Sequence, residues 1–247
     1  MPALLPLSAK NKIQDRVGYI LDACRGKRVL HVGCADDPHT KVKLNKQTLL
    51  HSKIKGVAQE LYGIDLSTVG IKLLGEKGYK NLAVANVETM VNQSPFGSIK
   101  FDIVVAGETL EHLMNPGLFL NGAKQLLAKS VSSRLLITVP NAYCGYRFLY
   151  TLLTGKEAVN PDHVSYYSAK TLIKLVTTSG YDLDDISYYP ANESRNDLNH
   201  GLFRILWWAD CLAYWLQPAL GDGVMALFKI APDPIPGSRS DVLEHHS

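Results

Sequence analysis

Short apolar runs alternate along the chain with segments whose apolar residues recur at helical spacing. This alternation is typical of an α/β fold, in which crossover helices cover both faces of a mostly parallel sheet. Serine or proline at the start of three periodic segments suits the first turn of a helix, so we expect helices at 67–77, 116–129 and 168–179. We expect seven strands, at 28–32, 60–64, 81–84, 101–105, 135–139, 181–189 and 225–230.

The stretch 190–222 interrupts this pattern between the last two strands and holds all three tryptophans of the chain. We interpret it as a helical flap inserted into a single domain, 1–247, whose core is 28–190 and 223–231. Clustered aromatic residues suit a helix on the sheet edge, a substrate lid, a homodimer contact or a membrane-surface helix at 201–216. Its apolar run contains Arg204 and Asp210 and is too short for a transmembrane span.

Composition narrows the choice of partners and compartment. The 247 residues include 26 Lys+Arg and 23 Asp+Glu, a formal charge of +3 that does not favour a dedicated nucleic-acid binder. The four cysteines are scattered without a C-x-x-C pair, so neither a disulfide framework nor a cysteine zinc site is indicated. Because the apolar N-terminus lacks a basic leader, we do not expect it to be a signal peptide. We expect a cytoplasmic protein.

Ligands of open parallel sheets bind outside the carboxyl ends of the strands, so the residues that follow each strand carry the chemistry. After the first strand, Gly33 and Ala35 allow the backbone to approach a ligand closely. Asp36 and Asp37 follow, and G-x-G-x-x-G is absent, so a cationic ligand without phosphate fits better than a dinucleotide. After the second strand, Asp65 is placed either to accept hydrogen bonds from ribose hydroxyls or to cap a helix.

Five segments, RVLHVGCADDPHT, LYGIDLS, NLAVANVET, FDIVVAGETLEHL and LLITVPNA, follow one another at the predicted strand ends. Together they resemble the ordered motifs of class I S-adenosylmethionine-dependent methyltransferases, and in particular the small domains with a Leu-Glu-His signature, over roughly residues 28 to 190. The resemblance implies a Rossmann-like fold and S-adenosylmethionine as cofactor.

The resemblance also assigns cofactor contacts. It places Gly33 and Ala35 against the methionine part and Asp65 on the ribose, and it places Glu108 near the sulfonium. The sequence departs from the family at His31, which replaces an acidic residue, and at Ala35 and Asp37, which replace glycines. The connection from Gly33 to Asp65 is also enlarged. The remaining cofactor contacts that the resemblance implies are Leu66, Asn86, which takes the place of an adenine-binding Asp, and Val87.

Two carboxylates and two histidines form the candidate catalytic group. Glu108, Glu111 and His112 lie close together after the fourth strand, and His163 follows the fifth. Glu111, His112 and His163 are predicted to be catalytic, because an imidazole suits removal of a hydroxyl proton. All four residues also resemble the metal site of small-RNA 2′-O-methyltransferases, which implies Mg²⁺ or Mn²⁺ as a further cofactor. A helix cap is the alternative role of this Glu-His group.

The sequence therefore predicts a methyltransferase that O-methylates a small-molecule acceptor, namely a small metabolite, a lipid precursor or a sugar. Metal-assisted RNA 2′-O-methylation is an alternative, against which the low net charge counts. A binding or assembly protein that keeps the fold without turnover is another.

Overall fold

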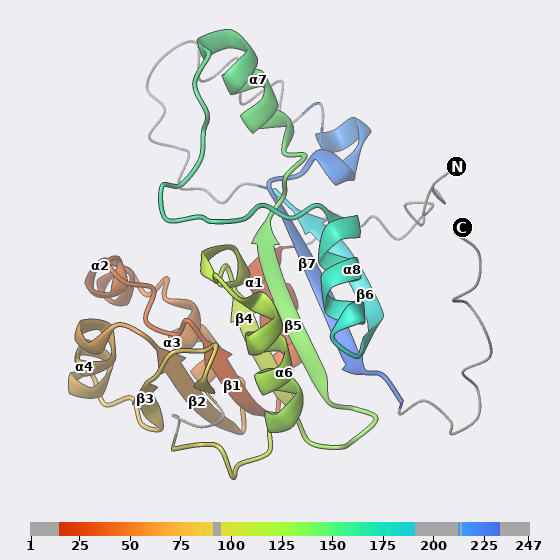
Figure 1. Ribbon diagram of the computed structural model, residues 1–247. Coiled ribbons are helices and arrows are strands. Elements are labelled where there is room, and N and C mark those ends of the chain that lie inside the picture. Colours follow the sequence, from red (N-terminus) through yellow and green to blue (C-terminus); the bar gives the residue numbers. More distant parts are fainter. Residues whose placement is uncertain (1–14, 91–94, 191–211, 213, 233–247) are drawn as a thin grey trace.

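The computed structural model describes residues 15–90, 95–190, 212 and 214–232. It contains a seven-stranded sheet with the order β3-β2-β1-β4-β5-β7-β6 (Figure 1). The first five strands pair in parallel, and β7 is antiparallel to both β5 and β6. The predicted mostly parallel sheet is thus confirmed. The strands are β1 (Arg28–Val32), β2 (Glu60–Asp65), β3 (Leu82–Val84), β4 (Ile103–Gly107), β5 (Arg134–Pro140), β6 (Tyr181–Tyr189) and β7 (Gly223–Ile230).

Helices cover both faces of the sheet, as predicted. On one face, α6 (Pro116–Leu126) and α8 (Ala169–Thr178) bury Phe119 and Leu172 in the largest apolar cluster. On the other face, α1 (Arg16–Cys24) and α3 (Leu50–Lys55) pack against β1, β4 and β5. The remaining elements are α2 (Thr40–Asn45), α4 (Thr68–Glu76), α7 (Gly145–Thr154) and the 3₁₀ helices η1 (Leu110–His112) and η3 (Pro218–Leu220).

The local signals explain where these helices begin and end. Ser67 caps α4, and Ser168 with Thr171 forms a capping box on α8. The predicted helix from Pro116 ends at residue 126 instead of 129, because Leu127 has extended backbone and bridges Phe101. The enlarged connection between β1 and β2 contains α2 and α3, two helices too short to show a clear period.

The carboxyl ends of β1 to β5 lie along one edge of the sheet, and the last residue of β6, Tyr189, pairs with Gly223 beside Pro140 at the same edge. Parallel pairing therefore brings the residues after each strand together, although they are far apart in the chain. Beyond this edge stands α7, on the same side as the segment that leads into β7 (Figure 1).

Most of the predicted flap, 190–222, lies outside the described residues, and so do Trp207 and Trp208. Its described part includes a helical stretch at 214–216 and η3. The predicted division into core and flap stays a prediction. Among the helices of the described residues, none combines the length and apolar character needed to cross a membrane.

Candidate active site

The turn after β1 brings backbone to the carboxyl edge with little side-chain bulk. Gly33 has a φ of 70°, in the left-handed region, and a Cβ added there would lie 2.8 Å from Thr109 Oγ1. Ala35 is fully buried, and a Cβ on Gly70 of α4 would lie only 2.5 Å from its methyl group. The turn is thus tight, with Gly33 half-buried and Ala35 packed against α4 without exposed surface.

Asp65 ties two turns together at the end of β2. One carboxylate oxygen accepts a hydrogen bond from the Ala35 N–H at 2.8 Å, and the other accepts one from the Ser67 N–H at 2.9 Å. Each oxygen keeps a second lone pair, so these bonds are compatible with ribose binding. Beside it, Leu66 is 70% exposed and offers an apolar surface at the same edge.

The loop after β3 places its two predicted residues differently. Asn86 is exposed, and its side-chain oxygen accepts a hydrogen bond from the Glu88 N–H at 2.9 Å. Val87 is buried in the main apolar cluster. The amide nitrogen of Asn86, the second lone pair of its side-chain oxygen and the backbone of the loop remain to contact an adenine ring.

Glu108 follows β4 with a φ of 55°, and its carboxylate is held by neighbouring strands. The buried Tyr189 hydroxyl donates a hydrogen bond to it, and Thr138 Oγ1 lies 3.5 Å from the same oxygen. Burial and the Glu108 charge together raise the pKa of Tyr189 well above its usual value. Tyr189 therefore stays protonated and keeps Glu108 in place.

Arg16, the first residue of α1, completes this group, although the sequence interpretation did not include it. Its Nε donates a hydrogen bond to Thr138 Oγ1 at 3.0 Å, and its guanidinium lies 5.7 Å from the centre of the Tyr189 ring. Burial would lower the pKa of Arg16, but the neighbouring acidic groups, of which Glu108 has the largest effect, outweigh it and raise that pKa. Among the described residues, no carboxylate forms an ion pair with the guanidinium.

The structure brings together Glu111, His112 and His163, with one potential ligand atom of each within 4.8 Å of the others. The two imidazole rings meet edge to face, with their centres 4.6 Å apart. His112 Nδ1 lies 3.0 Å from the carbonyl oxygen of Asp162 and must donate to it, so Nε2 of the neutral ring carries a free lone pair. Glu108 is not in this group.

The charges of this group depend on burial. Burial, and then the Glu108 charge, raise the pKa of Glu111 to about 9, so its carboxyl group holds a proton at neutral pH. Burial, followed by the nearby His112 and Arg147, lowers the pKa of His163 to about 4. His163 is therefore neutral at physiological pH and offers a lone pair rather than a charge.

His163 is held in turn by a chain of contacts that reaches α7. Its Nδ1 lies 3.1 Å from the Tyr166 hydroxyl, and the Arg147 guanidinium lies 5.4 Å from the centre of the Tyr166 ring. Arg147, on the first turn of α7, forms an ion pair with Asp222 at 3.3 Å. The position of His163 is thus linked to the base of α7.

Residues 8–186 match the profile of a family described as a methyltransferase domain. This match spans more than half of the chain. The chain belongs to this methyltransferase family.

Solved structures show the same fold. A SAM-dependent methyltransferase from Archaeoglobus fulgidus is 19% identical, with a TM-score of 0.54 over 86% of this chain and 90% of its own. The N-methyltransferase NodS from Bradyrhizobium japonicum WM9, in complex with S-adenosylhomocysteine, is 15% identical, with a TM-score of 0.50 over 87% and 85%. Magnesium protoporphyrin IX methyltransferase from Synechocystis PCC 6803, with bound S-adenosylhomocysteine, is 12% identical, with a TM-score of 0.50 over 87% and 80%. No curated protein sequence gives a significant match.

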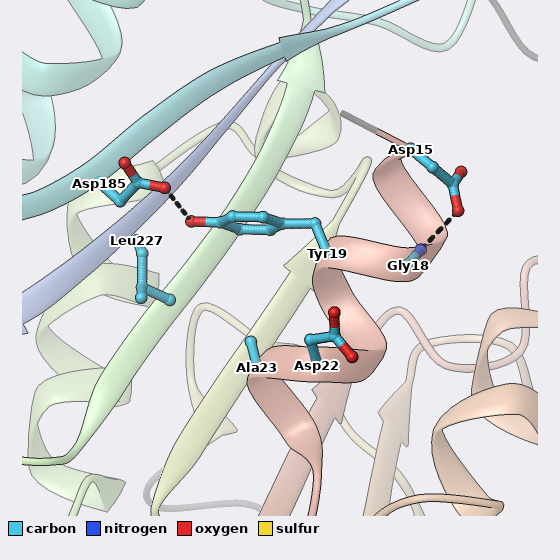
Figure 2. Close-up of a pocket in the computed structure, with 7 residues that line it drawn as sticks. All are labelled: Asp15, Gly18, Tyr19, Asp22, Ala23, Asp185 and Leu227. Atoms are coloured by element: carbon cyan, nitrogen blue, oxygen red, sulfur yellow. Dashed lines mark hydrogen bonds between the residues drawn. The ribbon is translucent and has the colours of Figure 1, made fainter. Parts of the chain in front are cut away.

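A cavity of about 560 Å³ lies elsewhere on the methyltransferase, between α1 and the strands β6 and β7 (Figure 2). There the Tyr19 hydroxyl donates a hydrogen bond to Asp185 at 2.9 Å, above Leu227 of β7. None of the predicted site residues lines this cavity, so it is separate from the carboxyl edge. It is lined by Asp15, Gly18, Tyr19, Asp22, Ala23, Asp185 and Leu227.

Proposed function

We propose that the methyltransferase transfers a methyl group from S-adenosylmethionine to a hydroxyl group of a small acceptor, such as a metabolite, a lipid precursor or a sugar. The observation that carries this proposal is the group Glu111, His112 and His163 at the carboxyl edge, next to the predicted cofactor residue Glu108. A hydroxyl must lose its proton as it attacks, and neutral imidazoles are suited to accept it.

The residues present fit the cofactor. The backbone at the half-buried Gly33 can approach a ligand closely, and Asp65 has lone pairs left for two ribose hydroxyls. The exposed Leu66 can cover one face of an adenine ring, and the loop at Asn86 and Val87 can border its edge. These contacts support the predicted site.

Arg16 and Glu108 extend this site to the amino-acid part of the cofactor. That part carries a carboxylate and an ammonium group, and the two side chains offer a positive and a negative partner beside the same strand ends. Arg16 has no ion-pair partner among the described residues, which leaves its guanidinium available for a carboxylate.

When bound, S-adenosylmethionine supplies a methyl group attached to a sulfonium sulfur, and this methyl carbon is open to attack by an acceptor oxygen. His112 is exposed, and its Nε2 lone pair is free, so it can reach the hydroxyl proton. His163 is a weaker proton acceptor because burial lowers its pKa. The main tasks of the protein are then to align the acceptor oxygen and to remove its proton.

Calorimetric titration with S-adenosylhomocysteine, followed by a screen of hydroxyl compounds with labelled S-adenosylmethionine, tests the proposal. We expect micromolar binding, and we expect His112→Ala to lower turnover at least a hundredfold while the affinity for S-adenosylhomocysteine changes less than twofold. Absence of binding would overturn the cofactor assignment. Equal turnover in the variant and the wild type would remove His112 from the mechanism.

A further inference from the structure

Two side chains of opposite charge meet at the carboxyl edge without neutralising each other. Arg16 and Glu108 are both half-buried, and both contact the same hydroxyl group. Opposite charges attract more strongly as water is excluded from them, so direct pairing would be the expected arrangement. No ion pair joins Arg16 to Glu108 or to any other carboxylate in the described part of the chain. Another group must therefore hold the two side chains apart.

The hydroxyl group of Thr138 contacts both of them. Thr138 belongs to β5 and is fully buried, and its Oγ1 accepts a hydrogen bond from Arg16 Nε at 3.0 Å. The same oxygen accepts one from the Glu108 N–H at 3.2 Å and lies 3.5 Å from Glu108 Oε1. Its two lone pairs serve the two N–H groups, which leaves the hydroxyl proton for the carboxylate. One hydroxyl group thus links the guanidinium to the carboxylate.

Further contacts hold each charged side chain without neutralising it. A Cβ added to Gly107, the last residue of β4, would lie 3.0 Å from Arg16 Nη2, so this glycine leaves space for the guanidinium. The Tyr189 hydroxyl donates a hydrogen bond to Glu108 Oε1, and its ring lies where a Cβ on Gly223 of β7 would be. Within the described residues, Glu108 Oε2 and the two Nη groups of Arg16 therefore have no hydrogen-bond partner.

We infer that Thr138 is a positioning residue that keeps Arg16 and Glu108 as two separate charges for a zwitterionic ligand. The inference rests on the proposed function, which places the amino-acid part of S-adenosylmethionine beside these side chains. The carboxylate of that part binds the Nη groups of Arg16, and its ammonium group binds Glu108 Oε2. Without the hydroxyl group the two side chains pair with each other, and the ligand binds only to the fraction of molecules in which they are separated.

Calorimetric titration of Thr138→Val with S-adenosylhomocysteine and with methylthioadenosine tests the inference. Valine has nearly the shape of threonine but has no hydroxyl group. We expect binding of S-adenosylhomocysteine, which carries the amino-acid part, to weaken at least about tenfold, as for a lost hydrogen bond to a charged group. Binding of methylthioadenosine, which lacks that part, should stay the same. Thr138→Ser keeps the hydroxyl group and should restore most of the S-adenosylhomocysteine affinity.

A matched control removes a hydroxyl group far from the strand ends. Thr177 of α8 donates a hydrogen bond to the Ile173 carbonyl at 2.8 Å. Thr177→Val should therefore leave the affinities for both ligands unchanged.

A double-mutant cycle tests the same inference without any ligand. Urea unfolding of Arg16→Gln, Glu108→Gln and the double variant gives the coupling between the two charges, as a factor in the unfolding equilibrium constant. The cycle is then repeated with Thr138→Val in every protein. We expect this factor to be at least about fivefold larger in the Thr138→Val background, where the charges pair directly.

The two experiments separate the inference from the proposed function. Absence of S-adenosylhomocysteine binding to the wild type overturns the proposed cofactor, and the double-mutant cycle then decides the role of Thr138. The inference is overturned if Thr138→Val binds S-adenosylhomocysteine as the wild type does, or loses both ligands equally. It is also overturned if Thr138→Ser binds as weakly as Thr138→Val, or if the coupling is the same in both backgrounds.

Discussion

Arg16 and Glu108 place opposite charges on the same side of the carboxyl edge, where the proposed site would hold a zwitterion. If Arg16 binds the cofactor carboxylate, Arg16→Gln should weaken S-adenosylhomocysteine binding about tenfold or more, as expected for loss of a charged hydrogen bond worth about 1.5–3 kcal/mol. Methylthioadenosine lacks the amino-acid part, and its affinity should change less than twofold. Calorimetry with the two ligands measures both effects.

Arg25 provides the matched control, because it follows the same helix and forms an exposed ion pair with Asp22. Arg25→Gln should leave both affinities unchanged. Equal weakening of both ligands by Arg16→Gln would show instead that Arg16 only supports the fold, through its hydrogen bond to Thr138.

Among the elements, the strands were the most predictable and the short helices the least. Apolar runs such as those of β1 and β5 are almost completely buried by helices on both faces, so their apolar composition alone predicts them as strands. In α2 and α3, six residues are too few to show a period.

The candidate site was predictable only where side chains follow strands directly. Gly33, Asp65 and Glu108 lie at strand ends, and sheet topology brings them together. Arg16 belongs to α1, which precedes the first recognised motif in the sequence, and no local pattern predicts a role for it. The convergence of Glu111 and His163 depends on how the loop before α8 folds back, so the sequence suggested the residues without their geometry.

The helix α7 is attached to the sheet through a small number of polar contacts at its first turn. Arg147 pairs with Asp222 and donates to the Asn141 carbonyl at 3.2 Å, and both charged side chains are about one-fifth exposed. Arg147→Met should therefore lower hydrogen-exchange protection within α7 while protection in β1 and β4 stays the same. Exchange measured by mass spectrometry on peptides from each element tests this.

A comparable ion pair elsewhere in the sheet serves as the control. Arg134 of β5 pairs with Asp184 of β6 at 2.7 Å, at the opposite end of these strands from α7. Arg134→Met should leave α7 exchange unchanged. If Arg147→Met did the same, other contacts would have to hold α7 in place.

At the scale of the whole molecule, two buried histidines link folding to pH. His31 of β1 and His51 of α3 are almost inaccessible, and their Nδ1 atoms lie 3.2 Å apart. One Nδ1–H can donate a hydrogen bond to the other Nδ1 only while that second nitrogen is unprotonated. Burial and Lys55 lower the pKa of His51 to about 4, and burial, followed by His51 and Arg16, lowers the pKa of His31 well below its usual value.

Because the folded-state pKa values lie below the unfolded value of about 6.5, the unfolded chain binds more protons as pH falls. The stability from keeping these rings neutral is complete above about pH 6.5, and for His51 it declines until about pH 4. The free energy of unfolding should fall with a slope approaching about 1.4 kcal/mol per pH unit for each histidine.

Urea unfolding of wild type and His51→Gln between pH 7 and pH 5 measures this slope. The variant should show a shallower one, whereas His39→Gln, which removes an exposed histidine, should match the wild type. Parallel curves for all three proteins would show that the buried pair does not control the acid sensitivity of the fold.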